Sequence, residues 1–495
     1  MRARPVKTFV AMSVVVLSTL GIGPAAAAGP EQVDVVMSDG VRIEATVLPA
    51  VPGSPLVLIP GEVGVPRLMY QAPLQALHSR GYTVIVYDPR GTFGSTGEFD
   101  FAGPREIQDV SELIDWAGGR FGTGAAAVAG MGNGGGTGLL AAAHDRRIRA
   151  VVSLGGWADL TRAWFPGGTA DVEAIGTQRL LGGATSRFGA DARHILDAAD
   201  PQRFTAARDV DMRALAANRP AVFVGQAWGD SLYPPRQLVD AFAGYRGPLR
   251  LELSAGDHSV SDAPGGYLGL PNHDWDTAYR WLDAALRGTD PGLLGEPPLH
   301  LAPMTSSPAE MLGGQQYSAP MAIADLRATT GLALGAGVLD PAAASTATTL
   351  VGGAAGVDSG PVYLTGALQY LGTVQPAPLG AVTPAWRTAV FAAPRRLVGL
   401  PDLTVTVGMA HPATVVAYLY DEGPDGSGVL LSHAPVTVTG TGSVTVELQP
   451  VDWVVAAGHR LTLIVGTHDS RYAGVTAPGA AITLTAGRLD LPLQD

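Results

Sequence analysis

The sequence predicts two folded domains: a doubly wound α/β domain with an inserted helical cap, and an all-β domain after it. Three observations carry this prediction. Apolar runs alternate with helical segments over residues 29–300, residues 160–219 are helical in tendency without a strand, and alternating β patterns fill 361–495. Alternating strands and helices are typical of a parallel sheet covered by helices. Short strands between Gly, Pro and Asp turns are typical of a sandwich or jelly roll.

The α/β domain opens with two β-prone runs around Asp39-Gly40, a hairpin signal. Five apolar runs then predict strands that are buried on both faces. They lie at 55–61, 83–91, 125–131, 148–156 and 220–230, and a sixth follows at 249–258. Helical spacing occurs between them, at 68–81, 104–120, 136–145 and 272–288. This order predicts βαβ units in one sheet.

Residues 301–360 are rich in Ala, Gly, Ser, Thr and Pro, and we interpret them as a linker into the β domain. The β domain itself is predicted from eight alternating segments. They are 361–371, 387–399, 402–410, 413–422, 432–440, 443–455, 459–468 and 480–487.

The first 28 residues predict a bacterial Sec-type signal peptide. A positive start, an apolar run and the small-residue stretch "GPAAAA" follow in order, with cleavage expected after Ala28. The apolar run is short for a membrane anchor, which is the alternative interpretation. We therefore expect a secreted protein without a membrane span after cleavage.

Composition excludes several classes of partner and site. The formal net charge is −12, which disfavours nucleic acid and anionic membranes. The chain has no cysteine, so it has no disulfide and no thiolate site. Its scattered histidines show no metal-ligand spacing. We expect no metal and no cofactor.

Candidate catalytic residues follow three of the predicted strands. Gly132-Asn133-Gly134 follows the strand near Met131, Asp230 follows the strand near Gln226, and His258 follows the strand near Ser254. Ligands bind outside the carboxyl ends of strands in such sheets. A nucleophile turn, an acid and a histidine in this chain order are typical of α/β-hydrolases.

The chemistry assigns a role to each position. Asp230 would hold the tautomer of His258, and His258 would deprotonate a nucleophile at position 132. The backbone N–H groups of Asn133, Glu62 and Val63 would form the oxyanion hole. Asp257 is a competing carboxylate, but residues adjacent in sequence usually point apart.

The glycine-rich run also has an alternative interpretation as a phosphate loop. Gly130, Gly132 and Gly135 fit Gly-x-Gly-x-x-Gly, but no Gly-Lys-Ser/Thr ending follows and no acidic residue fits after the next strand. Nucleotide binding is therefore disfavoured.

These motifs resemble the X-Pro dipeptidyl-peptidase and cocaine-esterase (CocE/NonD) family. The resemblance rests mainly on "RGYTVIVYDPRGTFGSTGEF" (80–99), "GQAWGDSLYPP" (225–235) and "VVAAGHRLTLIVGTHDSRY" (454–472). It implies an α/β-hydrolase core with a helical cap and a galactose-binding-like jelly roll. Members of the family are serine peptidases, esterases or acylases that act on small acyl or proline-containing substrates. The resemblance therefore implies such an activity, with Asp230 as the acid and His258 as the base.

The chain departs from the family pattern at two positions. Gly132 stands where the family has serine, and the oxyanion tyrosine is missing from "PGEVGVP", with Tyr70 further along. Other hydroxyls lie at Thr137, Ser153 and Ser231, none at a turn expected to face His258. We therefore hypothesise a pseudo-hydrolase that binds a small acyl, peptide or glycan-like ligand. The alternatives are an active serine hydrolase with an unrecognised nucleophile, and a carbohydrate-binding wall protein acting through its β domain.

Overall fold

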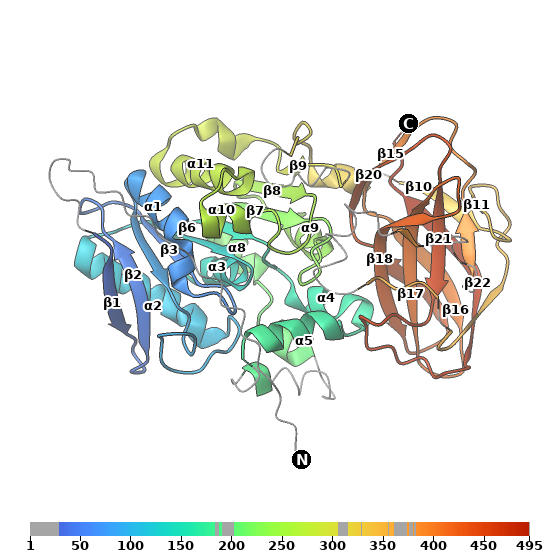
Figure 1. Ribbon diagram of the computed structural model, residues 1–495, viewed down its shortest axis with the longest axis horizontal. Helices are drawn as coiled ribbons and strands as arrows, with labels where there is room; N and C mark the ends of the chain where they lie inside the picture. The colour runs from blue at the N-terminus through green and yellow to red at the C-terminus, as the bar shows by residue number, and fades with distance from the viewer. Residues whose placement is uncertain are drawn as a thin grey trace, which may run out of the picture.

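The computed structural model describes residues 29–183, 188–190, 202–304, 315–327, 329–354, 356–360, 374–375, 380 and 383–494. The expected signal peptide and the expected strand at 361–371 lie outside these residues, as does part of the expected cap. Figure 1 shows an α/β region and a β region side by side along the longest axis.

Within the described residues, nine strands form one mixed sheet in the order β1-β2-β4-β3-β5-β6-β7-β8-β9. β1 and β2 form the expected hairpin, β2 pairs antiparallel with β4, and the other neighbours are parallel. The apolar runs make strands buried on both faces, as predicted. The strands are β1 (Glu31–Val36), β2 (Arg42–Leu48), β3 (Leu56–Pro60), β4 (Thr83–Tyr87), β5 (Ala126–Met131), β6 (Ile148–Leu154), β7 (Ala221–Ala227), β8 (Leu249–Ser254) and β9 (Leu299–Leu301).

Helices cover both faces of this sheet. Apolar side chains of α2 and α3 join one core cluster, and those of α1 and α11 join a second cluster on the opposite face. Each amphipathic helix therefore buries one stripe against the strands. The helices are η1 (Arg67–Tyr70), α1 (Gln71–Ser79), α2 (Pro104–Phe121), α3 (Asn133–His144), α9 (Arg236–Phe242), α10 (Ala263–Leu268), α11 (His273–Arg287) and η3 (Pro291–Gly295).

The insertion between β6 and β7 is helical in its described parts, as expected. Aspartates begin three of its helices: the side chains of Asp159, Asp171 and Asp211 accept N–H bonds from the first turns of α4, α5 and α8. Aromatic rings join it to the α/β core, since Phe101 stacks on Trp157 and packs at a tilt against Trp164. The elements are α4 (Leu160–Trp164), η2 (Pro166–Gly168), α5 (Val172–Leu181), α7 (Gln202–Ala206) and α8 (Met212–Asn218).

The C-terminal region is an antiparallel β domain. In the described residues its sheets run β11-β10-β22-β16-β19 with β12 on β22, then β13-β18-β17-β21-β14, and a separate β15-β20 pair. The strands are β10 (Thr330–Leu334), β11 (Leu339–Asp340), β12 (Thr348–Val351), β13 (Val374–Gln375), β14 (Ala385–Arg387), β15 (Arg395–Gly399), β16 (Asp402–Gly408), β17 (Ala413–Glu422), β18 (Gly428–Val438), β19 (Gly442–Glu447), β20 (Val451–Val455), β21 (Arg460–Gly466) and β22 (Ala481–Leu491). A short 3-10 helix, η4 (Ile323–Arg327), precedes β10.

The segment 301–360, expected to be a linker, contributes strands to this domain. β10, β11 and β12 lie inside it, and β10 and β12 both pair with β22. The two buried leucines of β10, Leu332 and Leu334, alternate with small residues. The small residues of β10 carry a weak β signal, and β11 and β12 are only two and four residues long, which is why periodicity did not reveal these strands.

Buried charges join the two regions. The Arg471 guanidinium of the β domain donates to the Asp171 carboxylate of the cap over 2.6 Å, and also to the Ser231 carbonyl of the α/β core. Arg236 of α9 donates to the Leu448 carbonyl over 2.7 Å. The β domain therefore closes against the edge of the sheet where the predicted site lies (Figure 1).

Candidate active site

The turn between β5 and α3 has the geometry of a nucleophile elbow. Gly132 has φ +48° and ψ −118°, a conformation that strains any residue with a side chain. A Cβ on Gly130 would lie 2.3 Å from the Gly134 carbonyl carbon, and one on Gly136 would lie 2.6 Å from the Trp157 ring. The glycines of this run are therefore required by the close approach of strand, helix and cap.

The structure brings Asp230 and His258 together. They follow β7 and β8, and His258 Nδ1 lies 3.0 Å from Asp230 Oδ2 with both side chains buried. Asp230 Oδ1 accepts the N–H groups of Leu232 and Tyr233 over 3.0 and 2.8 Å. Gln226 donates to Asp230 Oδ2 over 2.8 Å. These bonds fix the carboxylate so that it orients the imidazole, the arrangement of an acid and base in a hydrolase.

The competing carboxylate, Asp257, binds the backbone of the two loops that carry Asp230 and His258. Its Oδ1 accepts the backbone N–H groups of Ser231 and His258 over 2.8 and 2.7 Å. Burial and the neighbouring Asp230 raise the pKa of Asp257. This carboxylate therefore braces the two loops that carry the acid and the histidine.

A side chain that sequence reasoning did not use, that of Glu62, completes the site. A Cβ built on Gly132 would lie only 2.3 Å from Glu62 Oε1, so this carboxylate fills the space of a nucleophile side chain. Glu62 Oε1 lies 3.3 Å from His258 Nε2, and Glu62 Oε2 accepts the hydroxyl of Tyr267. The result is a continuous Glu62–His258–Asp230 row in the place of a serine triad.

The two carboxylates control the charge of His258. Burial lowers its pKa, but Asp230 and then Glu62 outweigh burial and raise the pKa well above its ordinary value of 6.5. The carboxylates beside its two ring nitrogens therefore favour the imidazolium form of His258. Asp262 also contributes to this field, and burial raises its pKa to about 7.

The predicted oxyanion-hole residues lie around the same point. Asn133 is the first residue of α3, where backbone N–H groups lack intrahelical partners, and Val63 is buried beside Glu62 in the loop after β3. Their role stays a prediction. Tyr70 was expected to lie too far along the chain to serve as the oxyanion tyrosine. The short helix η1 brings it next to Tyr267, with the two rings edge-on and their centroids 5.4 Å apart.

Gly155 is a second site residue that the sequence did not reveal. It follows β6 with φ +61°, and a Cβ there would lie 3.3 Å from His258 Cε1. In the sequence, Gly155 is visible only as part of a Gly-Gly pair after a predicted strand, and this pattern does not mark a site residue. Tyr267 left no signal, because it meets Glu62 across 205 positions of the chain.

The alternative hydroxyls occupy the positions expected from the sequence. Thr137 is buried within α3, and Ser153 lies inside β6 against the elbow helix, where a Cβ on Gly135 would come within 2.7 Å of its Oγ. Ser231 directly follows Asp230, and its N–H is directed to Asp257.

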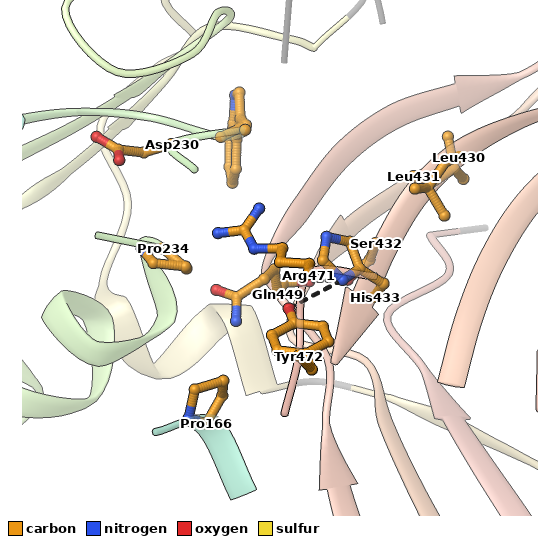
Figure 2. A pocket seen from close by; sticks show the side chains of 12 residues that line it. Pro166, Asp230, Pro234, Leu430, Leu431, Ser432, His433, Gln449, Arg471 and Tyr472 are labelled. Carbon is orange, nitrogen blue, oxygen red and sulfur yellow. Dashed lines mark hydrogen bonds between the residues drawn. The ribbon is translucent and has the colours of Figure 1, made fainter. Parts of the chain in front are cut away.

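A narrow cavity of about 30 Å³ lies where the α/β core, the cap and the β domain meet (Figure 2). This volume holds one or two water molecules. The Tyr472 hydroxyl lies 3.1 Å from His433 Nδ1, and burial together with Arg471 lowers the pKa of His433 to about 3. The lining residues are Pro166, Trp228, Gly229, Asp230, Pro234, Leu430, Leu431, Ser432, His433, Gln449, Arg471 and Tyr472.

Among the residues that the structure describes, no group of three or more His, Asp or Glu side chains is placed to hold a metal ion. In the same part of the chain, no helix combines the length and the apolar character that a membrane span requires.

The fold and this site define the class: an α/β-hydrolase fold with a helical insertion and a C-terminal antiparallel β domain. Residues 39–260 match the family described as X-Pro dipeptidyl-peptidase (S15 family). Residues 383–491 match the X-Pro dipeptidyl-peptidase C-terminal non-catalytic domain. Both domains of the chain are therefore similar to those of the X-Pro dipeptidyl-peptidase (S15) hydrolases. The search of curated proteins gives no match.

Solved structures share the whole architecture at low sequence identity. An aminopeptidase from the marine sediment archaeon Thaumarchaeota archaeon has TM-score 0.69 and 15% identity, covering 94% of this chain and 96% of its own. A CocE/NonD family hydrolase from Staphylococcus aureus has TM-score 0.72 and 14% identity, covering 94% and 93%. An alpha-amino acid ester hydrolase has TM-score 0.66 and 15% identity, covering 96% and 98%. These similarities establish the fold.

Proposed function

We propose that this protein is a secreted hydrolase-fold protein that has lost serine-type acyl transfer and keeps a site for a small acyl, peptide or glycan-like ligand. One observation carries the proposal. The Glu62 carboxylate lies 2.3 Å from the position of a Cβ on Gly132, so the nucleophile's place is filled by a residue from another loop. The family's reaction requires a hydroxyl at that point.

Two further features oppose serine-type catalysis. A general base must be neutral to take a proton, whereas Asp230 and Glu62 raise the pKa of His258 and so favour its imidazolium form. Loss of a triad nucleophile also costs about 10⁶-fold in turnover, leaving about 10³–10⁴-fold over water. A low residual rate on esters is therefore expected.

Retention of a ligand site is supported by the rest of the structure. Asp230 and His258 are fully assembled, and the Glu62 side chain keeps 11% of its surface exposed beside them. The site lies at the seam of core, cap and β domain. A protein that bound nothing at this junction would have no need of the buried charged side chains of Asp230 and His258 there.

The experiment for this proposal treats the purified protein with a fluorophosphonate probe. p-Nitrophenyl acetate and alanyl-prolyl-p-nitroanilide serve as substrates. We expect no covalent label and no rate above that of the His258→Ala variant. Labelling of the wild type that disappears in His258→Ala would overturn the proposal.

Secretion has its own test. Expression of the full chain in a bacterial host, followed by N-terminal sequencing of the exported protein, is expected to give a chain beginning at Gly29. Recovery of uncleaved protein in the membrane fraction would contradict the signal-peptide interpretation.

The assembled Asp230–His258 pair favours one alternative, an active serine hydrolase with another nucleophile. Peptide mapping of a labelled wild-type protein would then place the probe on Thr137, Ser153 or Ser231. Substitution of the labelled residue by alanine would abolish turnover.

A further inference from the structure

The Glu62 carboxylate presents its two oxygens to different partners. Oε1 faces the Gly132 elbow and His258 Nε2 at 3.3 Å, whereas Oε2 accepts the Tyr267 hydroxyl. Oε1 therefore lies where a nucleophilic oxygen belongs, and Oε2 has a hydrogen-bond donor directed at it. The carboxylate is also the most accessible member of the row, with 11% of its side chain exposed against 1% for His258 and 0% for Asp230.

We propose that Glu62 is a carboxylate nucleophile and that this site opens small epoxides to diols through a covalent Glu62 ester. The proposal rests on the proposed function in one respect, that Glu62 has taken the place of the serine. Carboxylates act as nucleophiles in other enzymes. Attack on an acyl carbon would give a reactive anhydride, whereas attack on the strained carbon of an epoxide gives a stable ester that water can hydrolyse.

In the first step, Glu62 Oε1 forms a bond to an epoxide carbon as the ring C–O bond breaks. The electron pair of that bond goes to the ring oxygen, which leaves on the face opposite Oε1 and takes a proton from water, and the hydroxide so formed takes the proton from His258 Nε2. The products are a hydroxyalkyl ester of Glu62 and a neutral His258. His258 Nε2 lies 3.3 Å from the attacking oxygen, and in its imidazolium form it supplies the proton that this step needs.

In the second step, water attacks the carbonyl carbon of the ester. Neutral His258 takes a proton from that water, because esterification has removed one of the two carboxylates that held it charged. The tetrahedral intermediate carries its negative charge on Oε2, where the Tyr267 hydroxyl donates. Collapse breaks the bond between the carbonyl carbon and Oε1 and releases the diol. The alkoxide takes the proton back from His258, or from water, and a final exchange with solvent restores the imidazolium and the carboxylate.

The experiment uses the full mature protein with styrene oxide and 1,2-epoxyhexane. A single turnover with protein in excess is run in H₂¹⁸O, and both the diol and the peptide containing Glu62 are analysed by mass spectrometry. The mechanism predicts an unlabelled diol, since its new oxygen comes from Glu62, and one ¹⁸O atom in the Glu62 carboxylate. Label in the first-turnover diol, or no consumption of either epoxide, would overturn the proposal.

Glu62→Gln is expected to lower the epoxide turnover rate by at least about 100-fold, because the amide is not a nucleophile. Glu98→Gln is the matched control, since Glu98 is exposed in a loop of the same domain. Both variants must keep the wild-type unfolding midpoint. A Glu62→Gln variant that is folded and retains the wild-type epoxide rate contradicts the proposal.

Tyr267→Phe separates a reacting role from a structural one. Loss of the donor to Oε2 should slow hydrolysis of the ester, so acid-quenched Tyr267→Phe protein should carry more Glu62 adduct than the wild type. The chain contains no cysteine that would react with epoxides in competition. A negative result with the epoxides does not change the result expected with the fluorophosphonate probe. The epoxide proposal and the proposed loss of serine-type catalysis can therefore fail independently.

Discussion

The two halves of the site differ in what they keep of the family's chemistry. On one side, Asp230 and His258 are buried, 3.0 Å apart, and held by three further hydrogen bonds to the carboxylate. On the other side, the elbow keeps its backbone geometry but carries glycine, and Glu62 fills the vacated space. The comparison teaches that a buried acid–histidine pair can lie beside an elbow that carries glycine and is filled by a carboxylate from a different loop.

The acid–histidine half also contributes stability, so its removal should have the largest effect. Asp230→Ala leaves the His258 charge without its buried partner, and we expect a loss of about 3–5 kcal/mol in the free energy of unfolding. Urea denaturation measures this. Asp276→Ala on the exposed side of α11 is the control, with an expected loss below about 1 kcal/mol. Equal losses in the two variants would mean that the buried Asp230–His258 pair contributes no more to stability than an exposed aspartate.

The contacts between the α/β region and the β domain should have the next largest effect on stability. Arg471→Ala removes the bonds to Asp171 and to the Ser231 carbonyl, next to the loop of Asp230. We expect a loss of about 3 kcal/mol, because Asp171 is left buried and unpaired. Arg488→Ala breaks an exposed pair with Asp490 and should cost at most about 0.5 kcal/mol. If Arg471→Ala lowers the free energy of unfolding no more than Arg488→Ala does, the contacts between the two regions do not stabilise the protein as proposed.

The pH dependence sharpens the comparison further. Because folding raises the pKa of His258, its contribution to stability is fully present below about pH 6.5 and is lost as the pH rises through the raised pKa. In that window this group should lower the free energy of unfolding by about 1.4 kcal/mol per pH unit. His258→Gln should flatten the profile, and His411→Gln at an exposed position should not. A wild-type profile that rises above neutral pH would oppose an imidazolium.

The smallest predicted effect concerns the glycine beside the imidazole. Gly155→Ala combines a left-handed backbone with a Cβ at 3.3 Å from His258 Cε1, and should cost about 1–2 kcal/mol. Gly288→Ala has φ +71° and open space, so it measures the backbone contribution alone. The Gly155 variant should also shift the His258 ring resonances, and an unchanged NMR spectrum would contradict the contact.

Much of this architecture was predictable, and the failures have physical causes. The strands β3 to β8 were found because buried parallel strands are continuous apolar runs, and Asp230 and His258 were found because loops at one sheet edge must converge. β10 was missed because its small residues carry little periodicity, and β12 was missed because it is only four residues long. The side chain of Glu62 was missed because only a three-dimensional arrangement brings it to Gly132 and Tyr267.

The central claim is that Glu62 occupies the place of the nucleophile. The most direct test is the fraction of protein labelled by a fluorophosphonate in Gly132→Ser and in Gly132→Ser/Glu62→Ala. In the single variant the serine side chain must share its space with the Glu62 carboxylate and face a charged His258, so we predict little labelling. In the double variant the Glu62 carboxylate neither fills this space nor adds to the raised pKa of His258, and we predict near-complete labelling that His258→Ala abolishes. Full labelling of the single variant, or none in a folded double variant, would contradict the account.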